Sequence, residues 1–248
     1  MIKVIVSGIS GKMGKEIVRL SEEFEDISII AGFDIEKGER AQTVEIDVEK
    51  LPKGFDVIVD FSSPQGAIDI LQFSVENKKP FVTGTTDFSE DEESAIVKAS
   101  REIPVLKASN MSVGINTLIR ILEGLPDMFY KKFDIEVVET HHRMKKDSPS
   151  GTAKTLAKII SNRSGKTSFI YGREGSNLQR KHDDIGMHSL RGGTVVGTHT
   201  IFFHGDNESI EITHRAHSRR IFALGALSAA RWIVQQKPGL YSMQDLLL

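Results

Sequence analysis

Residues 139–152, Glu-Thr-His-His-Arg-Met-Lys-Lys-Asp-Ser-Pro-Ser-Gly-Thr, concentrate the side chains best suited to acid–base chemistry. Two histidines and three cations fall within residues 141–146. A strand-like run at 134–140 precedes them, and the Pro-Ser-Gly-Thr that follows is typical of a helix start. Backbone N–H groups and the dipole at a helix start favour an anion. The stretch therefore predicts a cationic pocket that binds a carboxylate and can offer it a proton.

Groups in this stretch have two distinct chemical uses. Lys145 is suited to act as an acid near neutral pH, because a neighbouring histidine lowers the cost of losing its proton. The N–H groups of Gly151 and Thr152, at the helix start, can bind an oxyanion. The alternative interpretation is that Arg143, Lys145 and Lys146 are solvated surface charges, as charge runs usually are.

Other chemistries fit the stretch less well. His141 and His142 could suggest metal ligands, but neighbouring residues of an extended segment point to opposite faces, and neither His-x3-His nor clustered carboxylates accompany them. We therefore expect no metal. Ser150 lacks the Gly-x-Ser-x-Gly setting of a nucleophilic serine. The chain has no cysteine, which excludes disulfides and thiolate chemistry.

The composition is that of an ordinary soluble globular protein, with 248 residues, of which 39% are hydrophobic and 27% charged. A formal net charge of −2 gives no general attraction to nucleic acid or membrane, so we expect neither as a partner. No apolar run approaches the ~18 residues of a membrane span. Met1 leads directly into a strand pattern without the layout of a signal peptide, and we expect a cytoplasmic protein.

The elements that must position this chemistry begin with a strand. Residues 2–7 are apolar apart from Lys3, as in a strand buried on both faces. A turn with Gly8, Gly11 and Gly14 follows, and a helical pattern comes next. Such a turn lets the backbone approach a pyrophosphate that rests on the helix start. The spacing is Gly-x-x-Gly-x-x-Gly rather than the commoner Gly-x-Gly-x-x-Gly, so the motif alone is a weak signal.

Four further strand patterns follow at residues 27–33, 55–60, 79–82 and 104–108. Helix starts lie between them, with Ser63 before a proline and a capping box from Ser89 to Glu92. The alternation of strands and helices predicts an α/β fold with a Rossmann-like, doubly wound parallel sheet.

Ligands of such sheets bind beyond the carboxyl ends of the strands, and these ends carry small or polar residues here. Asp34 ends the second strand pattern, where an acid can bind the adenosine ribose hydroxyls. We therefore predict that NADH or NADPH is bound by residues of five successive loops: Gly8, Ser10, Gly11, Lys12, Met13 and Gly14; Asp34; Phe61 and Ser62; Gly84, Thr85 and Thr86; and Ser109, Asn110 and Met111.

The pattern changes in the second half of the chain. A single helix is expected at 113–129, and antiparallel strands at 194–204 and 208–214. The polar, glycine-rich stretch 161–193 shows no clear structure, which is typical of functional or mobile segments. A helix rich in small residues at 221–234 should pack back on the first domain.

These changes predict two domains. Residues 1–112 with 217–248 form the dinucleotide-binding domain, and 113–216 form a smaller α+β domain that binds the substrate. The two crossings, 110–112 and 217–219, are candidate hinges for closure of the substrate domain over the cofactor.

The motif Glu-Thr-His-His-Arg-x-Lys-x-Asp-x-Pro-Ser-Gly-Thr-Ala at 139–153 closely resembles the signature of the bacterial dihydrodipicolinate reductase family, the 4-hydroxy-tetrahydrodipicolinate reductases. The resemblance covers the whole chain. Besides the glycine turn, it includes short motifs at 59–64, 84–86, 108–112, 114–116 and 214–219.

The resemblance implies an NAD(P)H-dependent oxidoreductase that reduces 4-hydroxy-tetrahydrodipicolinate to tetrahydrodipicolinate on the diaminopimelate route to lysine. His141 matches the family's proposed proton donor and Lys145 its catalytic lysine, and either could deliver the proton. The positions that hold the carboxylates of this dicarboxylate are matched by His142, Ser150, Gly151 and Thr152. Family members are typically homotetramers built through the sheet of the second domain, with edge strands around 194–214 as the matching candidates here.

One position departs from the family. The acid at Asp34 is there often followed by an arginine that can meet a 2′-phosphate, whereas Ile35 follows here. Asp34 favours the free ribose hydroxyl of NADH and would repel the phosphate of NADPH. Lys12 and Lys37 could restore some binding of NADPH. We predict use of both cofactors with a preference for NADH.

Two other classes of function remain open on the residues alone. A non-catalytic, nicotinamide-sensing protein would share the fold but would be expected to have degraded proton-donor and carboxylate positions, which are intact here. An aspartate- or homoserine-type dehydrogenase would share the first domain but not the motif at 139–153.

Overall fold

The computed structural model describes residues 1–34, 44–45 and 47–248. Ile35 and Lys37, which bear on the expected cofactor preference, lie outside these residues. The chain forms two compact units, of which unit 1 comprises Met1–Val113 and Arg219–Leu248 and unit 2 comprises Gly114–Ser218.

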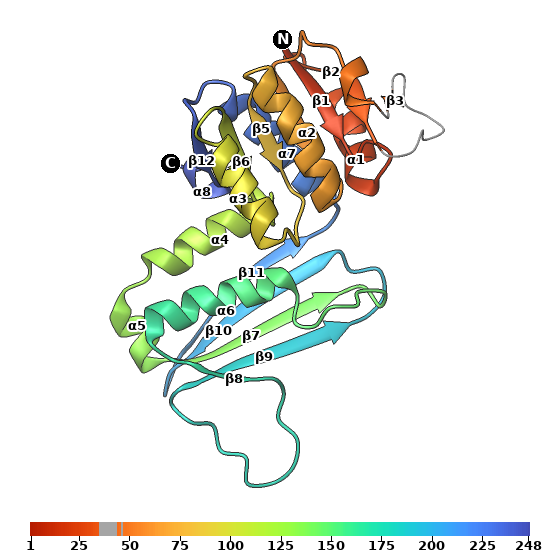
Figure 1. The fold of residues 1–248 in the computed structure, drawn as a ribbon. Helices are drawn as coiled ribbons and strands as arrows, with labels where there is room; N and C mark the ends of the chain where they lie inside the picture. Colours follow the sequence, from red (N-terminus) through yellow and green to blue (C-terminus); the bar gives the residue numbers. More distant parts are fainter. Residues whose placement is uncertain (35–43, 46) are drawn as a thin grey trace. The chain divides into compact units, whose positions relative to one another are not determined.

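Unit 1 is a doubly wound α/β domain (Figure 1). Its described residues form one sheet of seven strands, namely β1 (Ile2–Ser7), β2 (Ile27–Phe33), β3 (Val44–Glu45), β4 (Val57–Asp60), β5 (Phe81–Thr83), β6 (Pro104–Lys107) and β12 (Gly239–Tyr241). The order is β12-β6-β5-β4-β1-β2-β3, and all these pairings are parallel. β1 lies between β2 and β4, so its carboxyl end is the topological switch point of the sheet. The predicted fold class is confirmed.

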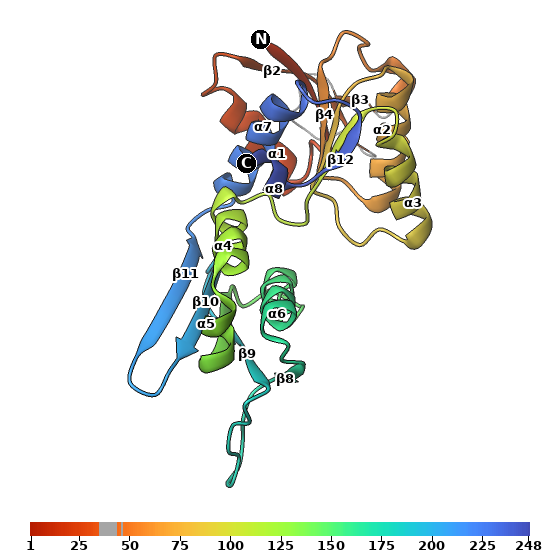
Figure 2. The same ribbon diagram turned by 90° about the vertical axis from the view of Figure 1, so that its left-hand side faces the viewer.

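Helices cover both faces of this sheet. They are α1 (Lys12–Ser21), α2 (Pro64–Glu76), α3 (Glu90–Ala99), α7 (Arg220–Ile233) and the short α8 (Met243–Leu246), with a 3₁₀ turn, η1, at Val48–Lys50. Figure 2 shows α1 and α7 on one face and α2 and α3 on the other. Val4 of β1 shares a buried cluster with Ile17 and Leu227, whereas its neighbour Ile5 shares a cluster with Ile70. Successive residues of β1 thus serve opposite faces, which explains its continuous apolar run.

Two of the predicted helix starts are confirmed by their caps. Ser63 Oγ accepts a hydrogen bond from the Gly66 N–H at 3.3 Å, and Pro64 is the first residue of α2. At α3, Ser89 and Glu92 form the expected capping box, in which Ser89 N donates to Glu92 Oε2 at 2.7 Å. Each cap satisfies N–H groups that have no acceptor within the helix.

Unit 2 is an α+β domain with a mixed sheet. The strands are β7 (Asp134–His141), β8 (Ser168–Ile170), β9 (Asp184–Arg191), β10 (Gly197–His204) and β11 (Ser209–Ala216), and the helices are α4 (Val113–Gly124), α5 (Asp127–Lys132) and α6 (Gly151–Ser164). The strand order is β11-β10-β7-β9-β8. β10 runs antiparallel to β7 and β11, whereas β9 runs parallel to β7 and β8. The three helices contribute to a single buried cluster on one face of this sheet (Figure 2).

β7 connects this core to the predicted chemistry. Its residues alternate between half-buried and buried. Ile135 and Val137 point toward the helices and pack in the same cluster as Leu156 of α6. The next two positions of the same face are Glu139 and His141, which are also buried. The apolar core therefore passes into a buried polar site at the carboxyl end of the strand.

The predicted single helix at 113–129 is wrong. α4 ends at Gly124 and α5 begins at Asp127, with Pro126 as its N-cap. Proline has no N–H to donate, and its ring disfavours the helical conformation of the residue before it. The apolar periodicity continues across the break because residues of both helices face the same core.

The prediction that 161–193 has no clear structure is also wrong. α6 continues to Ser164, and both β8 and β9 lie in this stretch. β9 escapes detection because its pattern, Asp-Ile-Gly-Met-His-Ser-Leu-Arg, contains polar residues on both faces. The strand forms because it fits between β7 and β8, which is a non-local reason.

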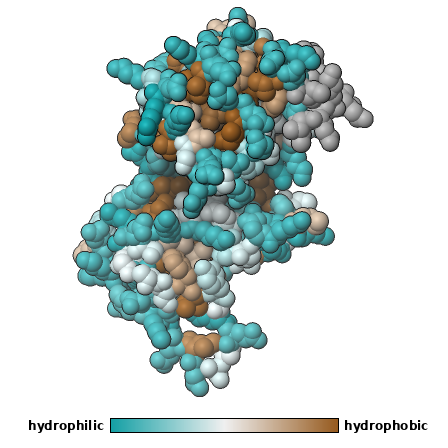
Figure 3. All heavy atoms as spheres, viewed as in Figure 1, coloured by the Kyte–Doolittle hydropathy of each residue, from teal (hydrophilic) through white to brown (hydrophobic). Residues whose placement is uncertain are grey.

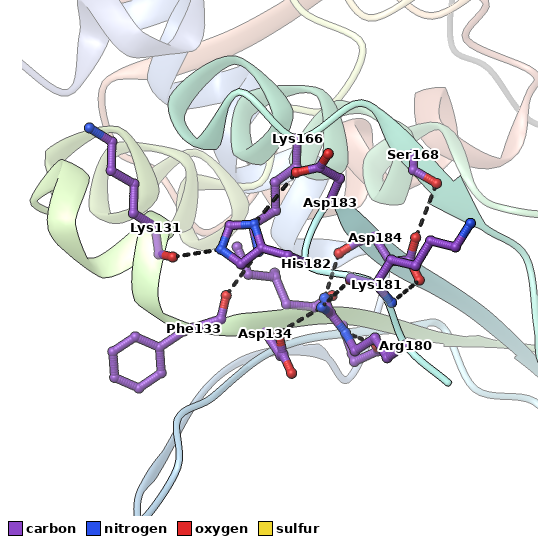
Figure 4. Close-up of polar contacts among 12 residues, drawn as sticks. Lys131, Phe133, Asp134, Lys166, Ser168, Arg180, Lys181, His182, Asp183 and Asp184 are labelled. Atoms are coloured by element: carbon purple, nitrogen blue, oxygen red, sulfur yellow. Dashed lines mark hydrogen bonds and ion pairs between the residues drawn. The ribbon is translucent and has the colours of Figure 1, made fainter. Parts of the chain in front are cut away.

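The loop between β8 and β9 is fastened to the sheet by polar contacts (Figure 4). Arg180 donates to Asp134 Oδ1 at 2.6 Å and also to the carbonyl oxygen of Asp184. Nε2 of His182 lies 3.1 Å from the carbonyl oxygen of Lys131. Asp134 and Lys131 are distant in sequence from the loop, so these two contacts have no local signature.

The predicted antiparallel hairpin near residues 194–214 is confirmed as β10 and β11. Its expected position at the sheet edge is only half right. β11 lies at the edge, but β10 is an interior strand because it also pairs with β7 along Thr198–His204.

In the described part of the chain, we find no helix with the length and apolar character needed to cross a membrane. Hydrophilic side chains predominate on the face of the molecule drawn in Figure 3, with apolar side chains scattered between them.

Candidate active site

The glycine turn of unit 1 connects β1 to α1. Gly8 has a φ of +74°, and a Cβ there would lie 2.3 Å from the carbonyl oxygen of Phe61. A Cβ at Gly14 would lie 2.3 Å from the carbonyl oxygen of Gly8. The chain can therefore pass this closely only without side chains, at the start of a helix that suits a phosphate. Ser10 Oγ is buried without a hydrogen-bond partner in the described structure, and a bound phosphate would supply one.

Asp34, the predicted ribose-binding residue, lies beside the glycine turn that is predicted to bind the pyrophosphate. Its Oδ2 accepts a hydrogen bond from the Ser10 N–H at 2.8 Å. Lys12 is exposed in the first turn of α1. The acid and the turn thus fit two neighbouring parts of one nucleotide.

The loops after β4 and β5 are joined by Asp60, a carboxylate of the 59–64 motif that was not among the predicted site residues. Asp60 is fully buried and accepts hydrogen bonds from three hydroxyls: Ser62 Oγ at 2.5 Å, Thr83 Oγ1 at 2.8 Å and Thr85 Oγ1 at 2.7 Å. Ser62 and Thr85 are both predicted cofactor contacts. Asp60 fixes the two loops relative to each other.

The remaining predicted cofactor residues differ in what they can present to a ligand. Gly84 supports the Phe61 ring, since a Cβ on it would lie 2.3 Å from Phe61 Cε1. Met111 is 2% exposed, and a Cβ on Gly225 of α7 would lie 1.7 Å from its carbonyl oxygen. The Met111 side chain is therefore part of the core. The others are exposed or half-buried, with Gly11, Thr86, Ser109 and Asn110 in the loops and Met13 in the first turn of α1.

In unit 2, the carboxyl end of β7 carries the predicted proton donor. His141 is 8% exposed, and its Nδ1 lies 2.6 Å from Oε2 of Glu139. Burial opposes the charge on Glu139, but hydrogen bonds from Arg191 and His141 outweigh it and lower its pKa to about 2. An ionised carboxylate can only accept, so His141 Nδ1 is the donor.

The charge state of His141 follows from the balance of its neighbours. Burial lowers its pKa more than the hydrogen bond and the charge of Glu139 raise it. The resting imidazole is therefore neutral near pH 7, with the proton on Nδ1 and a lone pair on Nε2. A Cβ on Gly197 of β10 would lie 3.0 Å from this Nε2, so the glycine leaves room for the ring.

The loop between β7 and α6 carries the predicted cations. Lys145 Nζ lies 2.9 Å from Asp147 Oδ1, and the lysine side chain is 22% exposed. Arg143 and Lys146 are exposed, as solvated charges would be, whereas His142 is half-buried.

Ser150 supports the helix start with a side chain that is already engaged. Its residue is 2% exposed, and Oγ accepts a hydrogen bond from the Ala153 N–H at 3.2 Å as the N-cap of α6. Oγ also lies 3.1 Å from Nε2 of His199 on β10. Burial lowers the pKa of His199 to about 4, so this imidazole is neutral at pH 7.

Gly151 and Thr152 begin α6, where the helix dipole favours an anion. Gly151 is exposed, and a Cβ added to it would meet nothing within 4 Å. Thr152 is half-buried beside it. The space at this helix start suits a carboxylate group.

Three residues of this arrangement were not predicted: the buried Glu139 and the half-buried Arg191, which form an ion pair, and His199. Arg191 meets Glu139 because β9 lies parallel to β7, a pairing that has no local signal. Glu139 and His141, two residues apart on one strand, share a face, and this spacing was a usable signal. We find no cluster of three or more His, Asp or Glu side chains able to hold a metal ion, within the residues that the structure describes.

Comparison with known proteins gives two family matches. Residues 2–111 match the family model described as dihydrodipicolinate reductase, N-terminus, and residues 114–247 match the one described as dihydrodipicolinate reductase, C-terminus. A 4-hydroxy-tetrahydrodipicolinate reductase of Caldanaerobacter subterraneus is 42% identical over 247 residues, which are 99% of this chain and 98% of that protein. The one from Geotalea uraniireducens is 39% identical over 264 residues, covering 100% and 99%.

Solved structures agree on the fold. A dipicolinate-bound dihydrodipicolinate reductase from Paenisporosarcina sp. TG-14 has a TM-score of 0.84 at 23% identity, with 99% of each chain covered. An aspartate dehydrogenase from Thermotoga maritima, from a class considered as an alternative, has a TM-score of 0.50 at 12% identity, with 96% and 97% covered.

Proposed function

The chain belongs to the dihydrodipicolinate reductase family, and we propose that it is an NAD(P)H-dependent reductase that converts 4-hydroxy-tetrahydrodipicolinate to tetrahydrodipicolinate on the diaminopimelate route to lysine. The observation that carries the proposal is the combination of these family matches with the buried Glu139–His141 pair beside the start of α6. Unit 1 is the proposed dinucleotide-binding domain, and unit 2 is the proposed substrate domain.

A bound nicotinamide cofactor supplies the hydride for this reduction. The glycine turn suits its pyrophosphate, and the Asp34 carboxylate suits a ribose with free hydroxyls. Asp60 holds Ser62 and Thr85 in place for the remainder of the cofactor. The unpartnered Ser10 Oγ supports the view that these residues fit a phosphate-bearing ligand.

The substrate dianion requires positive charge and N–H donors. Gly151 and Thr152 at the start of α6 are proposed to hold one carboxylate, with His142 nearby in sequence. Ser150 is proposed to help through its helix cap and its main chain, since its hydroxyl is occupied by Ala153 and His199.

Either His141 or Lys145 is proposed to deliver the proton to the carbon next to the hydride acceptor. His141 is neutral in the resting site, and the proton on Nδ1 is bonded to Glu139. A bound dianion favours the imidazolium form, which would then carry a proton on Nε2 as well. Lys145 Nζ lies 2.9 Å from Asp147 Oδ1 in the loop that follows β7.

The test is an assay of NAD(P)H loss with the freshly made condensation product of pyruvate and aspartate semialdehyde. Lys145→Ala should reduce kcat far more than it weakens cofactor binding. Lys146→Ala is the matched control, because Lys146 is an exposed lysine at the next position, and it should keep wild-type turnover. Unchanged turnover in Lys145→Ala would refute the assigned role, and inactive wild-type protein would refute the proposed function.

Both cofactors are proposed to serve, with a preference for NADH, because the Asp34 carboxylate beside the turn repels a 2′-phosphate. Comparing kcat/KM for NADH and NADPH tests this, and a strong preference for NADPH would contradict it.

We also propose a cytoplasmic homotetramer assembled through the sheet of unit 2. In support, α4, α5 and α6 contribute to one cluster on one face of that sheet and leave the other face for such a contact. Light scattering should give a mass of about four times 27.5 kDa, and a monomeric mass would contradict the proposed tetramer.

A further inference from the structure

The Glu139 carboxylate connects several parts of the proposed substrate site. The side chain is 1% exposed, and both of its oxygens accept hydrogen bonds. His141 Nδ1 lies 2.6 Å from Oε2, and the Ser150 N–H donates to Oε1 at 3.1 Å. One carboxylate thus contacts both the predicted proton donor and the N-cap residue of α6.

Arg191 clamps the same carboxylate from the neighbouring strand. Its Nη1 donates to Glu139 Oε2 and its Nη2 to Oε1, both at 2.8 Å. Nη2 also donates to the carbonyl oxygen of Asp147 at 2.7 Å. Asp147 is the residue that pairs with Lys145. The guanidinium therefore ties the lysine-bearing loop to the carboxylate that holds His141.

We propose that Glu139 and Arg191 form a positioning pair that fixes the proton-donating and carboxylate-binding groups of the substrate site relative to one another. The inference rests on the proposed reductase function. Neither residue is assigned a contact with substrate or cofactor. Glu139 orients the His141 ring and the helix start, and Arg191 orients Glu139 and the loop of Lys145.

The pair works only as a charged pair of these residue types. Several donors converge on the two oxygens, among them Nη1 and Nη2 of Arg191, Nδ1 of His141 and the N–H of Ser150. A glutamine at position 139 has one carbonyl oxygen and one NH2 group. The donors that now bind the second carboxylate oxygen would then face the NH2 group, which cannot accept a hydrogen bond from them. A lysine at position 191 keeps the charge but loses the planar, two-pronged contact.

The same strand provides a matched control. Glu136, three residues earlier on β7, accepts a two-pronged contact from Arg173 at 2.9 Å and 2.9 Å. Its pKa is also lowered to about 2, against the effect of burial, by hydrogen bonds from Arg173, His188 and Arg180. Because residues 136 and 139 have opposite parity on a strand, Glu136 points to the other face of the sheet. Its hydrogen-bond partners are Arg173, Arg180 and His188, none of which belongs to the proposed substrate site. Because this face is also the proposed assembly face, light scattering must give the control variants the wild-type mass.

The experiment compares Glu139→Gln and Arg191→Lys with Glu136→Gln and Arg173→Lys in the full-length protein. Steady-state kinetics should show kcat lowered by about 100-fold in Glu139→Gln, the size expected when reacting groups are misplaced by about 1 Å. Arg191→Lys should retain more kcat than Arg191→Met. The KM for NADH should stay unchanged in all variants, and the two control variants should keep kcat within about threefold of wild type.

A second readout does not depend on activity. In protein with ¹⁵N-labelled histidine, NMR should show His141 as the Nδ1–H tautomer in wild type and in Glu136→Gln. In Glu139→Gln this tautomer should be lost, and the pKa of His141 should fall because the carboxylate that raises it is gone. Circular dichroism confirms that each variant is folded.

The outcomes separate the two ideas. Wild-type kcat in folded Glu139→Gln, or an unchanged His141 tautomer, would overturn the positioning pair. Equal losses in the test and control variants would also overturn it, since they would reflect general stability of the sheet. An inactive wild-type protein with the expected NMR pattern would refute the reductase function while leaving the positioning of His141 in place.

Discussion

Replacing His199 with glutamine should make the stability of unit 2 less sensitive to acid. His199 is 4% exposed, its Nε2 contacts Ser150 Oγ, and its Nδ1 has no hydrogen-bond partner among the described groups. The titratable neighbours that influence it are His141, Glu139, His214 and Lys145. Burial is the largest cause of its low pKa, so protonation requires a charge in a nearly dry site.

The size of the effect follows from the two pKa values. The imidazole takes up a proton near 6.5, its ordinary value, in the unfolded chain, but near about 4 in the folded one. The free energy of unfolding is therefore highest above pH 6.5, where His199 is neutral in both states. It decreases as the pH falls from 6.5 to 4, because the unfolded chain then binds a proton that the folded protein does not. At about 1.4 kcal/mol per pH unit, the whole difference is about 3 kcal/mol, of which about 2 kcal/mol disappears between pH 7 and pH 5.

Amide hydrogen exchange of β10 peptides, corrected for intrinsic rates, measures the opening free energy of unit 2 at pH 7 and pH 5. Wild type should lose about 2 kcal/mol more than His199→Gln over this interval. His204→Gln, an exposed histidine on the same strand, controls for the substitution itself. The interval stays above the range in which Glu139 is protonated. If both proteins lose the same free energy, His199 is charged at no cost in the folded state, and the reasoning fails.

Three further substitutions have expected outcomes. Gly197→Ala should lower kcat by about 10- to 100-fold with an unchanged KM for NADH, because the new Cβ would lie 3.0 Å from His141 Nε2 and displace the ring. A wild-type kcat would show that the His141 ring can move aside without loss of activity. Ser150→Ala should reduce the stability of unit 2 by about 1–2 kcal/mol in urea denaturation because α6 loses its cap, and no loss would contradict the capping role. Gly225→Ala should destabilise unit 1 by about 1–3 kcal/mol, because its Cβ would collide with the Met111 carbonyl. The fluorescence of the single tryptophan, which lies in unit 1, follows that unfolding. An unshifted transition would mean that α7 can shift away from Met111 to make room for the added methyl group at no cost in stability.

Local signals in the sequence were sufficient for much of unit 1. The apolar run of β1, the turn from Gly8 to Gly14 and the caps at Ser63 and Ser89 each depend on residues close in sequence. The same holds for the hairpin of β10 and β11, whose alternation is local. Pro126 was also a local signal, and the single-helix prediction gave the apolar period more weight than the proline.

The parts that could not be predicted depend on pairing between distant segments. Arg191 lies in a polar, glycine-rich stretch, and only the register of β9 with β7 brings it to Glu139. Asp60 and Thr85 meet because β4 and β5 are adjacent, although the residues are 25 apart in sequence. Partners of this kind are set by tertiary packing rather than by propensity.

The spacing within β7 explains why a site can grow directly out of a core. Side chains two residues apart on a strand share a face, so Ile135, Val137, Glu139 and His141 form one row. The first two are packed under α6, and the row then reaches the strand end, where the chain turns into the start of that same helix. A buried carboxylate is stable there only because donors from β9, from the helix start and from His141 converge on it. The groups that stabilise the buried charge of Glu139 are therefore the same groups whose positions the proposed chemistry requires. For this reason, a change at Glu139 should reduce kcat by more than the loss of stability alone would explain.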